Sequence, residues 1–132
     1  MGIKFDDKAP IYVQVMESIK RDIVIGRLKE GDKLPSVREM SSELKVNPNT
    51  IQRAYQELER ENLTYTQRGT GNFVKGDRMM IMELKKQMAR RSINVFIGDM
   101  KNLGFTPDEI AHIVSEELNK EGDKYGNNTE NR

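Results

Sequence analysis

The residues best suited to chemistry in this 132-residue chain are polar and lie between positions 38 and 69. Asn49 and Gln52 carry amides, which can pair through two hydrogen bonds with the edge of an adenine. The hydroxyl of Thr50 can reach either a base edge or a phosphate. Arginines and lysines occur on both sides of this segment, and a guanidinium group binds phosphate through parallel hydrogen bonds. These residue types indicate binding to a nucleic acid.

Catalytic chemistry has little support in the sequence. The chain has no cysteine and one histidine, and we find no paired carboxylates with a pocket that could shift their pKa values. His112 lies one step off the apolar face of its expected helix, which is typical of a surface histidine. Gly69-Thr70-Gly71 lacks the strand–loop–helix context and the lysine of a phosphate-binding loop. We therefore expect no enzyme activity, no cofactor and no metal site.

The formal net charge of +1 does not by itself indicate nucleic-acid binding. A DNA-binding interpretation must depend on a local basic face. No run approaches the roughly 20 apolar residues of a membrane span, so we expect no membrane insertion. No signal peptide is visible at the N-terminus. The absence of cysteine fits a reducing compartment, and we expect a cytoplasmic protein.

Two short helices should position the polar segment. Ser36 is a suitable N-cap, and Glu39 three residues later completes a capping-box pattern. Asn47 is a second N-cap and is followed by Pro48 at the first helical position, where its missing N–H has no cost. The intervening residues 44–46 allow only a sharp corner. This arrangement is typical of a helix-turn-helix, whose second helix enters the major groove.

A β-hairpin should follow the two helices. Residues 64–67 and 72–75 alternate as strands do. Gly69 permits a positive φ at the tip and a close approach to a minor groove, and Arg68 lies beside it. Before the helix-turn-helix, residues 10–26 have one apolar face and should form a scaffold helix that closes a three-helix core.

Taken in series, these motifs resemble the winged helix-turn-helix domain of the GntR family of bacterial transcription regulators. The resemblance covers roughly residues 10–75 and includes Leu34-Pro35-Ser36-x-Arg38-Glu39, Asn49-Thr50-x-x-x-Ala54, Leu58-Glu59 and Gly69-x-Gly71-x-Phe73-Val74. Residues 47–50 and the short C-terminal part are similar to the YtrA-type branch. The resemblance implies a homodimeric regulator, often a repressor, that binds double-stranded DNA.

From the motifs and the resemblance we expect DNA contacts from Arg38, Lys45, Asn47, Asn49, Thr50, Gln52, Arg53, Arg68 and Gly69. Asn47 ranks lower because its side chain can be used in capping its own helix. Many family members have arginine where Pro48 and Gln52 stand. The usual paired contact with guanine is therefore absent from these positions, and adenine-directed contacts gain importance.

The predicted fold is mainly α: a winged helix-turn-helix of three helices and a β-hairpin wing, followed by two C-terminal dimerisation helices. We place the DNA-binding domain at residues 1–76, the dimerisation region at 77–120 and a disordered tail at 121–132. The first C-terminal helix should span residues 78–103. The second should begin at a second capping box, Thr106 to Glu109.

Two amphipathic helices cannot enclose a core alone, so they should pair with a second chain. Packing back on the winged domain is the alternative. The expected dimer interface comprises Leu84, Met88, Phe96, Ile97, Met100, Ile110, Ile113 and Val114.

We therefore expect a DNA-binding regulator that recognises an inverted-repeat operator as a homodimer, and the resemblance favours a repressor. One alternative is a winged-helix module that binds proteins and not DNA; it would need no basic cluster around the polar helix start. Another is the N-terminal part of a larger enzyme, since MocR-type relatives fuse this domain to an aminotransferase-like one. The second capping box and the polar tail favour a chain that ends without such a domain.

Overall fold

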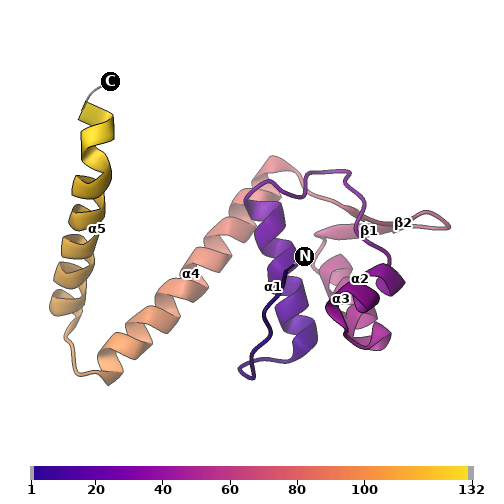
Figure 1. Ribbon diagram of the computed structural model, residues 1–132, viewed down its shortest axis with the longest axis horizontal. Helices are drawn as coiled ribbons and strands as arrows, with labels where there is room; N and C mark the ends of the chain where they lie inside the picture. The colour runs from indigo at the N-terminus through magenta and orange to yellow at the C-terminus, as the bar shows by residue number, and fades with distance from the viewer. Residues whose placement is uncertain (1, 131–132) are drawn as a thin grey trace. The chain divides into compact units, whose positions relative to one another are not determined.

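The computed structural model describes the backbone of residues 2–130 and the side chains of residues 2–122. It confirms the predicted fold, mainly helical with one two-stranded antiparallel sheet (Figure 1). In chain order the elements are α1 (Ile11–Val24), α2 (Val37–Leu44), α3 (Pro48–Arg60), β1 (Thr64–Gln67), β2 (Gly71–Val74), α4 (Arg78–Asn102) and α5 (Pro107–Glu130).

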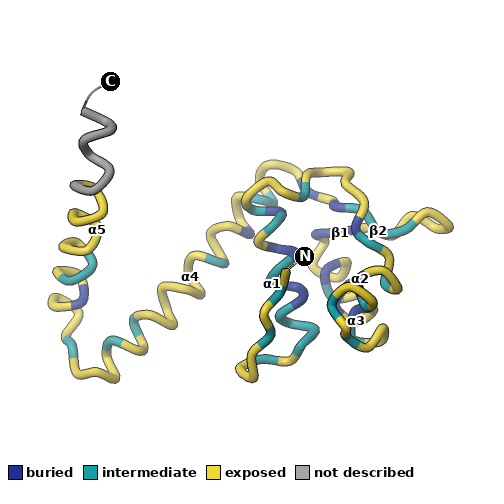
Figure 2. The backbone as a smooth tube through the Cα atoms, in the orientation of Figure 1, coloured by how far each residue is buried: buried dark blue, intermediate teal, exposed yellow. Residues whose placement is uncertain are grey.

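The core of the winged part lies where α1, α2 and α3 meet the base of the hairpin. It contains the apolar positions that recur at three- and four-residue steps in the sequence, and burying them provides the main driving force for folding. Figure 2 shows the buried segments on α1, α3 and the sheet. The most deeply buried side chains include Val15, Ile19, Leu34, Met40, Ile51, Leu58 and Val74.

The predicted caps fix the two helices of the helix-turn-helix. Ser36 Oγ accepts a hydrogen bond from the N–H of Glu39 at 3.0 Å, one half of the capping box. Asn47 Oδ1 accepts one from the N–H of Asn49 at 2.8 Å. Between the helices, Lys45 adopts the left-handed conformation with φ 56°, which ends α2 and turns the chain into α3.

The hairpin forms the wing, with Thr64 opposite Val74 and Gln67 opposite Gly71. The second strand begins and ends one residue earlier than predicted, since Gly71 already pairs across the hairpin. The loop before α2 adds a third extended segment, in which the N–H of Leu34 donates to the carbonyl of Asn72 at 2.8 Å. These bonds connect the wing base to the start of α2.

The chain divides into two compact units, residues 1–87 and 88–132, and the division falls within α4. The reason is that the first turns of α4 pack on the winged part. Gly76 is buried beside the side chain of Ile81. Leu84 is 5% exposed, and together with Leu63 it lines a cleft of about 330 Å³ between the end of α3 and the start of α4.

The second unit contains the rest of α4 and α5. Gly104, with φ 95°, follows the end of α4. The second capping box is complete: Thr106 Oγ1 accepts from the N–H of Glu109 at 3.2 Å, and Glu109 Oε1 accepts from the N–H of Thr106 at 2.9 Å. The helix that begins there runs to Glu130, where composition predicted a disordered tail from residue 121. No proline follows Pro107 to end the helix, while residues 131–132 lie outside the described range.

Candidate nucleic-acid interface

The predicted base-reading residues lie at the start of α3. Asn49 and Gln52 are exposed and Thr50 is half-buried. Ile51, between them, is fully buried and fixes this turn of the helix against the core. The free N–H groups and the dipole at a helix start favour a nearby anion. This end of α3 therefore combines amide and hydroxyl groups with backbone that attracts phosphate.

The basic residues of α2 and the turn flank this helix start. Arg38 and Lys45 are exposed, and neither side chain has a hydrogen bond or ion pair within the described residues. Asn47 is exposed, but its side-chain oxygen is occupied by the cap, which agrees with its lower rank. Arg38 and Lys45 are thus free to pair with phosphate, while Asn47 has a structural task.

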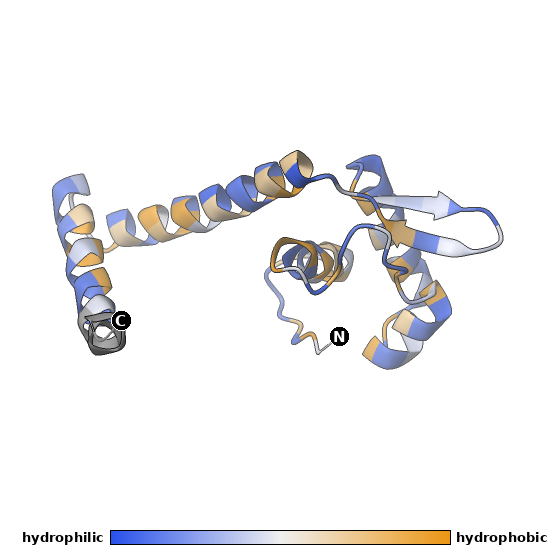
Figure 3. Cartoon of the chain, turned by 90° about the horizontal axis from the view of Figure 1, so that it is seen from above, coloured by the Kyte–Doolittle hydropathy of each residue, from blue (hydrophilic) through white to orange (hydrophobic). Residues whose placement is uncertain are grey.

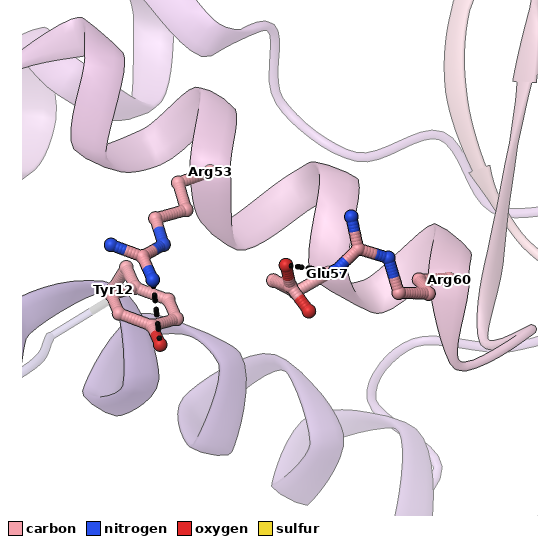
Figure 4. Close-up of polar contacts among 4 residues, drawn as sticks. All are labelled: Tyr12, Arg53, Glu57 and Arg60. Carbon is pink, nitrogen blue, oxygen red and sulfur yellow. Dashed lines mark hydrogen bonds and ion pairs between the residues drawn. The ribbon is translucent and has the colours of Figure 1, made fainter.

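Arg53 is held by α1. Its guanidinium carbon lies 3.9 Å from the centroid of the Tyr12 ring, and Nη2 donates to the Tyr12 hydroxyl at 3.3 Å (Figure 4). The expectation of a DNA contact from Arg53 did not include this pairing. A stacked guanidinium loses little conformational freedom when it binds a further ligand, because its planar fork is already oriented.

The acidic half of α3 is engaged in structural contacts. Glu57 pairs with Arg60 at 2.8 Å (Figure 4), and Glu61 pairs with the buried Lys20 of α1 at 2.9 Å. Glu59 accepts hydrogen bonds from the backbone N–H and the hydroxyl of Thr66 in β1. The carboxylates at this end repel phosphate, so only the first half of α3 suits a groove.

Arg68 and Gly69 lie exposed in the turn of the wing, where Gly69 has φ 79°. Glu59 attaches the wing to α3 through Thr66. On the outer face, the rings of Tyr65 and Phe73 stack with centroids 5.6 Å apart. These contacts fix the base of the hairpin and leave its basic tip free.

Tyr55 connects the two helices of the helix-turn-helix. Its hydroxyl donates to the carbonyl of Pro35 at 2.6 Å, one residue before the Ser36 cap. Burial, and then the nearby Glu39 and Glu43 carboxylates, raise the pKa of Tyr55 well above its usual range. The tyrosine stays a neutral donor, and its ring is part of the core.

The sequence of the winged part matches one family model. Residues 11–74 fit the model of bacterial regulatory proteins of the gntR family. The chain belongs to the GntR family. It is 44% identical over 114 residues to the HTH-type transcriptional regulator YhcF of Bacillus subtilis, covering 86% of this chain and 94% of YhcF. It is 35% identical to the transcriptional repressor YtrA of the same organism, covering 81% of this chain and 83% of YtrA.

Solved structures agree with this assignment. A GntR family transcriptional regulator from Listeria monocytogenes superposes with a TM-score of 0.76 at 44% identity, covering 85% of this chain and 98% of that one. The predicted resemblance to the GntR family and its YtrA-type members is confirmed, and with it the assignment as a DNA-binding transcription regulator. Within the described residues no helix is both long and apolar enough to cross a membrane.

The second unit of this GntR protein exposes apolar side chains along α4 and α5, where hydrophobic and hydrophilic residues alternate (Figure 3). Of the predicted interface residues, Phe96 is 40% exposed, and Met88, Ile97, Met100, Ile113 and Val114 are half-buried. Leu84 and Ile110 differ, because each is already buried within the single chain. The predicted interface omits the more exposed Ile93, Val95, Leu103 and Leu118.

Two residues near the helix-turn-helix have contacts that the sequence did not predict. Tyr12 falls on the apolar face of α1, which predicts a core position, yet it holds Arg53. Lys33 lies in the loop before α2, yet its side chain reaches the wing. The sequence feature that could have revealed the contact of Tyr12 is its polar hydroxyl at the edge of an apolar stripe. No feature of the sequence indicates the contact of Lys33 with the wing.

Proposed function

We propose that this GntR protein is a repressor that binds an inverted-repeat operator as a homodimer, with no catalytic role, in the cytoplasm. The observation that carries the proposal is the exposed polar start of α3, flanked by Arg38 and Lys45, which have no partner among the described residues. Side chains suited to reading bases and side chains suited to neutralising phosphate thus lie on adjoining elements, which supports the proposal. The repressor role is supported by the name of the relative YtrA.

In the proposed complex, each α3 enters a major groove by its first two turns, and each wing reaches the neighbouring minor groove with Arg68 and Gly69. Asn49 and Gln52 read adenines, and Thr50 contacts a base edge or a phosphate. Arg38 and Lys45 bind phosphates and set the register. A two-fold dimer then requires an operator with two-fold symmetry.

Dimerisation is the second part of the proposal, and the exposed apolar residues of the second unit support it. Phe96 and Ile93 are 40% and 53% exposed on α4, and Leu118 is 65% exposed on α5. Exposed apolar surface of this kind marks an interaction site. A second copy of the same unit offers a complementary apolar surface, since a two-fold interface uses the same patch on both chains.

Selection of bound fragments from random-sequence duplex DNA tests the proposal. We expect the selected pool to converge on an inverted repeat, and binding to the selected duplex to weaken linearly in log affinity against log salt. Sedimentation of the free protein should show a dimer. A pool that never converges, with no binding at low salt, would leave the alternative of a protein-interaction module as the better interpretation.

A further inference from the structure

Lys33 comes from the loop before α2, but its side chain ends on the wing. Its backbone forms an antiparallel bridge with Phe73 of β2. Paired residues in antiparallel strands project to the same face, so Lys33 shares the outer face with the stacked rings of Phe73 and Tyr65. Val74 and Thr64, the neighbouring pair, are buried on the opposite side.

The absence of a side chain at Gly71 allows the Lys33 side chain to lie against the wing. A Cβ atom at position 71 would lie 2.9 Å from Lys33 Cε and 3.7 Å from its Nζ. Gly71 also has φ 133°, a conformation that side-chain-bearing residues rarely adopt. The lysine stem therefore lies across the start of β2, and its ammonium sits beside the residue that closes the turn of the hairpin.

The Lys33 ammonium has no carboxylate partner among the residues that the structure describes. Arg68 lies in the same turn and is also exposed without a partner within the described residues. Two cations from segments about 35 positions apart in sequence thus belong to the wing: Lys33 beside Gly71, and Arg68 in the turn. Neither cation is neutralised within the described residues, so each can attract an anion such as a backbone phosphate.

We propose that Lys33 is a DNA-contacting residue of the wing, which binds a backbone phosphate beside the groove that Arg68 and Gly69 enter. The proposal rests on the proposed DNA-binding function and extends it to a residue outside the helix-turn-helix and the hairpin. When the Gly69 backbone approaches a duplex, the Lys33 ammonium on the same wing approaches it too. A fixed stem also leaves less conformational freedom to lose on binding.

The test compares full-length variants on the duplex selected by the wild-type protein and on a mixed-sequence duplex. Lys33→Met keeps the apolar stem and removes the charge, and Lys33→Arg keeps the charge. Lys29→Met, in the same loop and also exposed, is the matched control for net charge. Each variant is titrated across salt concentrations, and its melting temperature is measured without DNA.

We expect Lys33→Met to weaken binding to both duplexes and to lower the salt slope by about 0.9 for each phosphate that is no longer neutralised. Lys33→Arg should retain most of the affinity, Lys29→Met should match wild type, and no melting temperature should fall. Equal affinity and slope for Lys33→Met and Lys29→Met would overturn the proposal while leaving the DNA-binding function intact. Failure of the wild-type protein itself to bind any duplex would overturn both.

Discussion

The guanidinium of Arg53 in α3 stacks on the ring of Tyr12 in α1, with the guanidinium carbon 3.9 Å from the ring centroid (Figure 4). The contact connects the first turn of α1 to the middle of α3. It also uses one donor of the guanidinium for the Tyr12 hydroxyl. Arginine has five N–H donors, so the remaining ones can still reach a phosphate.

The first prediction concerns this pair. Arg53→Ala should lower the free energy of unfolding by about 0.5–1 kcal/mol, the usual size of an exposed cation–π contact, and should also weaken DNA binding. Tyr12→Leu should cause a similar decrease in stability, and the two decreases should not add in the double variant. Tyr12→Phe retains the stacking and serves as the control.

Chemical denaturation and DNA titration of these variants separate the two tasks. If Arg53→Ala is less stable but binds the selected duplex as tightly as wild type, Arg53 only connects the helices. Additive decreases in the double variant would show that the stacked geometry contributes nothing.

The second prediction is that Arg38→Ala and Arg68→Ala weaken DNA binding without lowering the melting temperature. Both side chains are exposed and lack protein partners within the described residues, so their removal costs no internal contact. Arg27→Ala is a useful control, because this arginine is exposed and lies outside the proposed interface. Wild-type affinity for both Arg38→Ala and Arg68→Ala would make these residues ordinary surface arginines.

The local features of the site are predictable, because they depend on neighbours in sequence. Ser36 and Asn47 cap the helices that their positions predicted, and Gly69 turns the hairpin. The polar residues around the buried Ile51 also lie at the start of α3, as predicted. Capping and amphipathic periodicity act within a few residues, so a single sequence is enough to indicate them.

The tertiary pairings are not predictable in this way. Tyr12 and Arg53 are 41 positions apart, and no periodicity connects residues on different helices. Lys33 reaches Gly71 only because the loop before α2 adds to the wing sheet. Leu84 illustrates the same limit, since its spacing shows that it is buried but not which surface covers it.

The third prediction concerns Tyr55 and pH. Tyr55→Phe removes the hydrogen bond to Pro35 and should cost about 1 kcal/mol of stability near neutral pH. Since burial raises the folded pKa of Tyr55 above the ordinary value of 10.0, the unfolded state loses its proton first as the pH rises. Wild-type stability from this group is therefore fully present below pH 10.0 and decreases above it.

The measurement is the difference in unfolding free energy between wild type and Tyr55→Phe at several pH values, which cancels the other titrating groups. The difference should shrink above pH 10.0. A difference that is constant with pH would contradict the raised pKa.

The fourth prediction follows from the unit boundary. A chain ending at Gln87 keeps Leu84 on the winged unit and should fold as a monomer, while a chain ending at Lys75 should be less stable because Leu63 loses its cover. The monomer should bind the selected duplex weakly. In a dimer, binding of one winged unit holds the second at a high effective concentration near the other half-site, and a monomer lacks this effect. Sedimentation of the shorter chains checks this, and a stable dimer of residues 1–87 would place the interface elsewhere.

The last prediction is about sequence reading. Gln52→Ala should relax the preference at one symmetric pair of operator positions, and Asn49→Ala at an adjacent pair, since a paired amide–adenine contact contributes about 1–3 kcal/mol of discrimination. Lys45→Ala should instead weaken all sequences alike, as removal of a phosphate-binding cation does. Binding-site selection repeated with each variant makes the comparison.

Asn47 provides the internal control for this reading experiment, because its side-chain oxygen already accepts from the Asn49 N–H at 2.8 Å and cannot form a paired contact with adenine. Asn47→Asp keeps an acceptor for the cap and should leave the preferred bases unchanged, although its added negative charge will weaken binding to every sequence. If Gln52→Ala behaves in the same uniform way, Gln52 is not a reader. Specificity would then come from Thr50, from the wing, or from the deformability of the DNA between the half-sites.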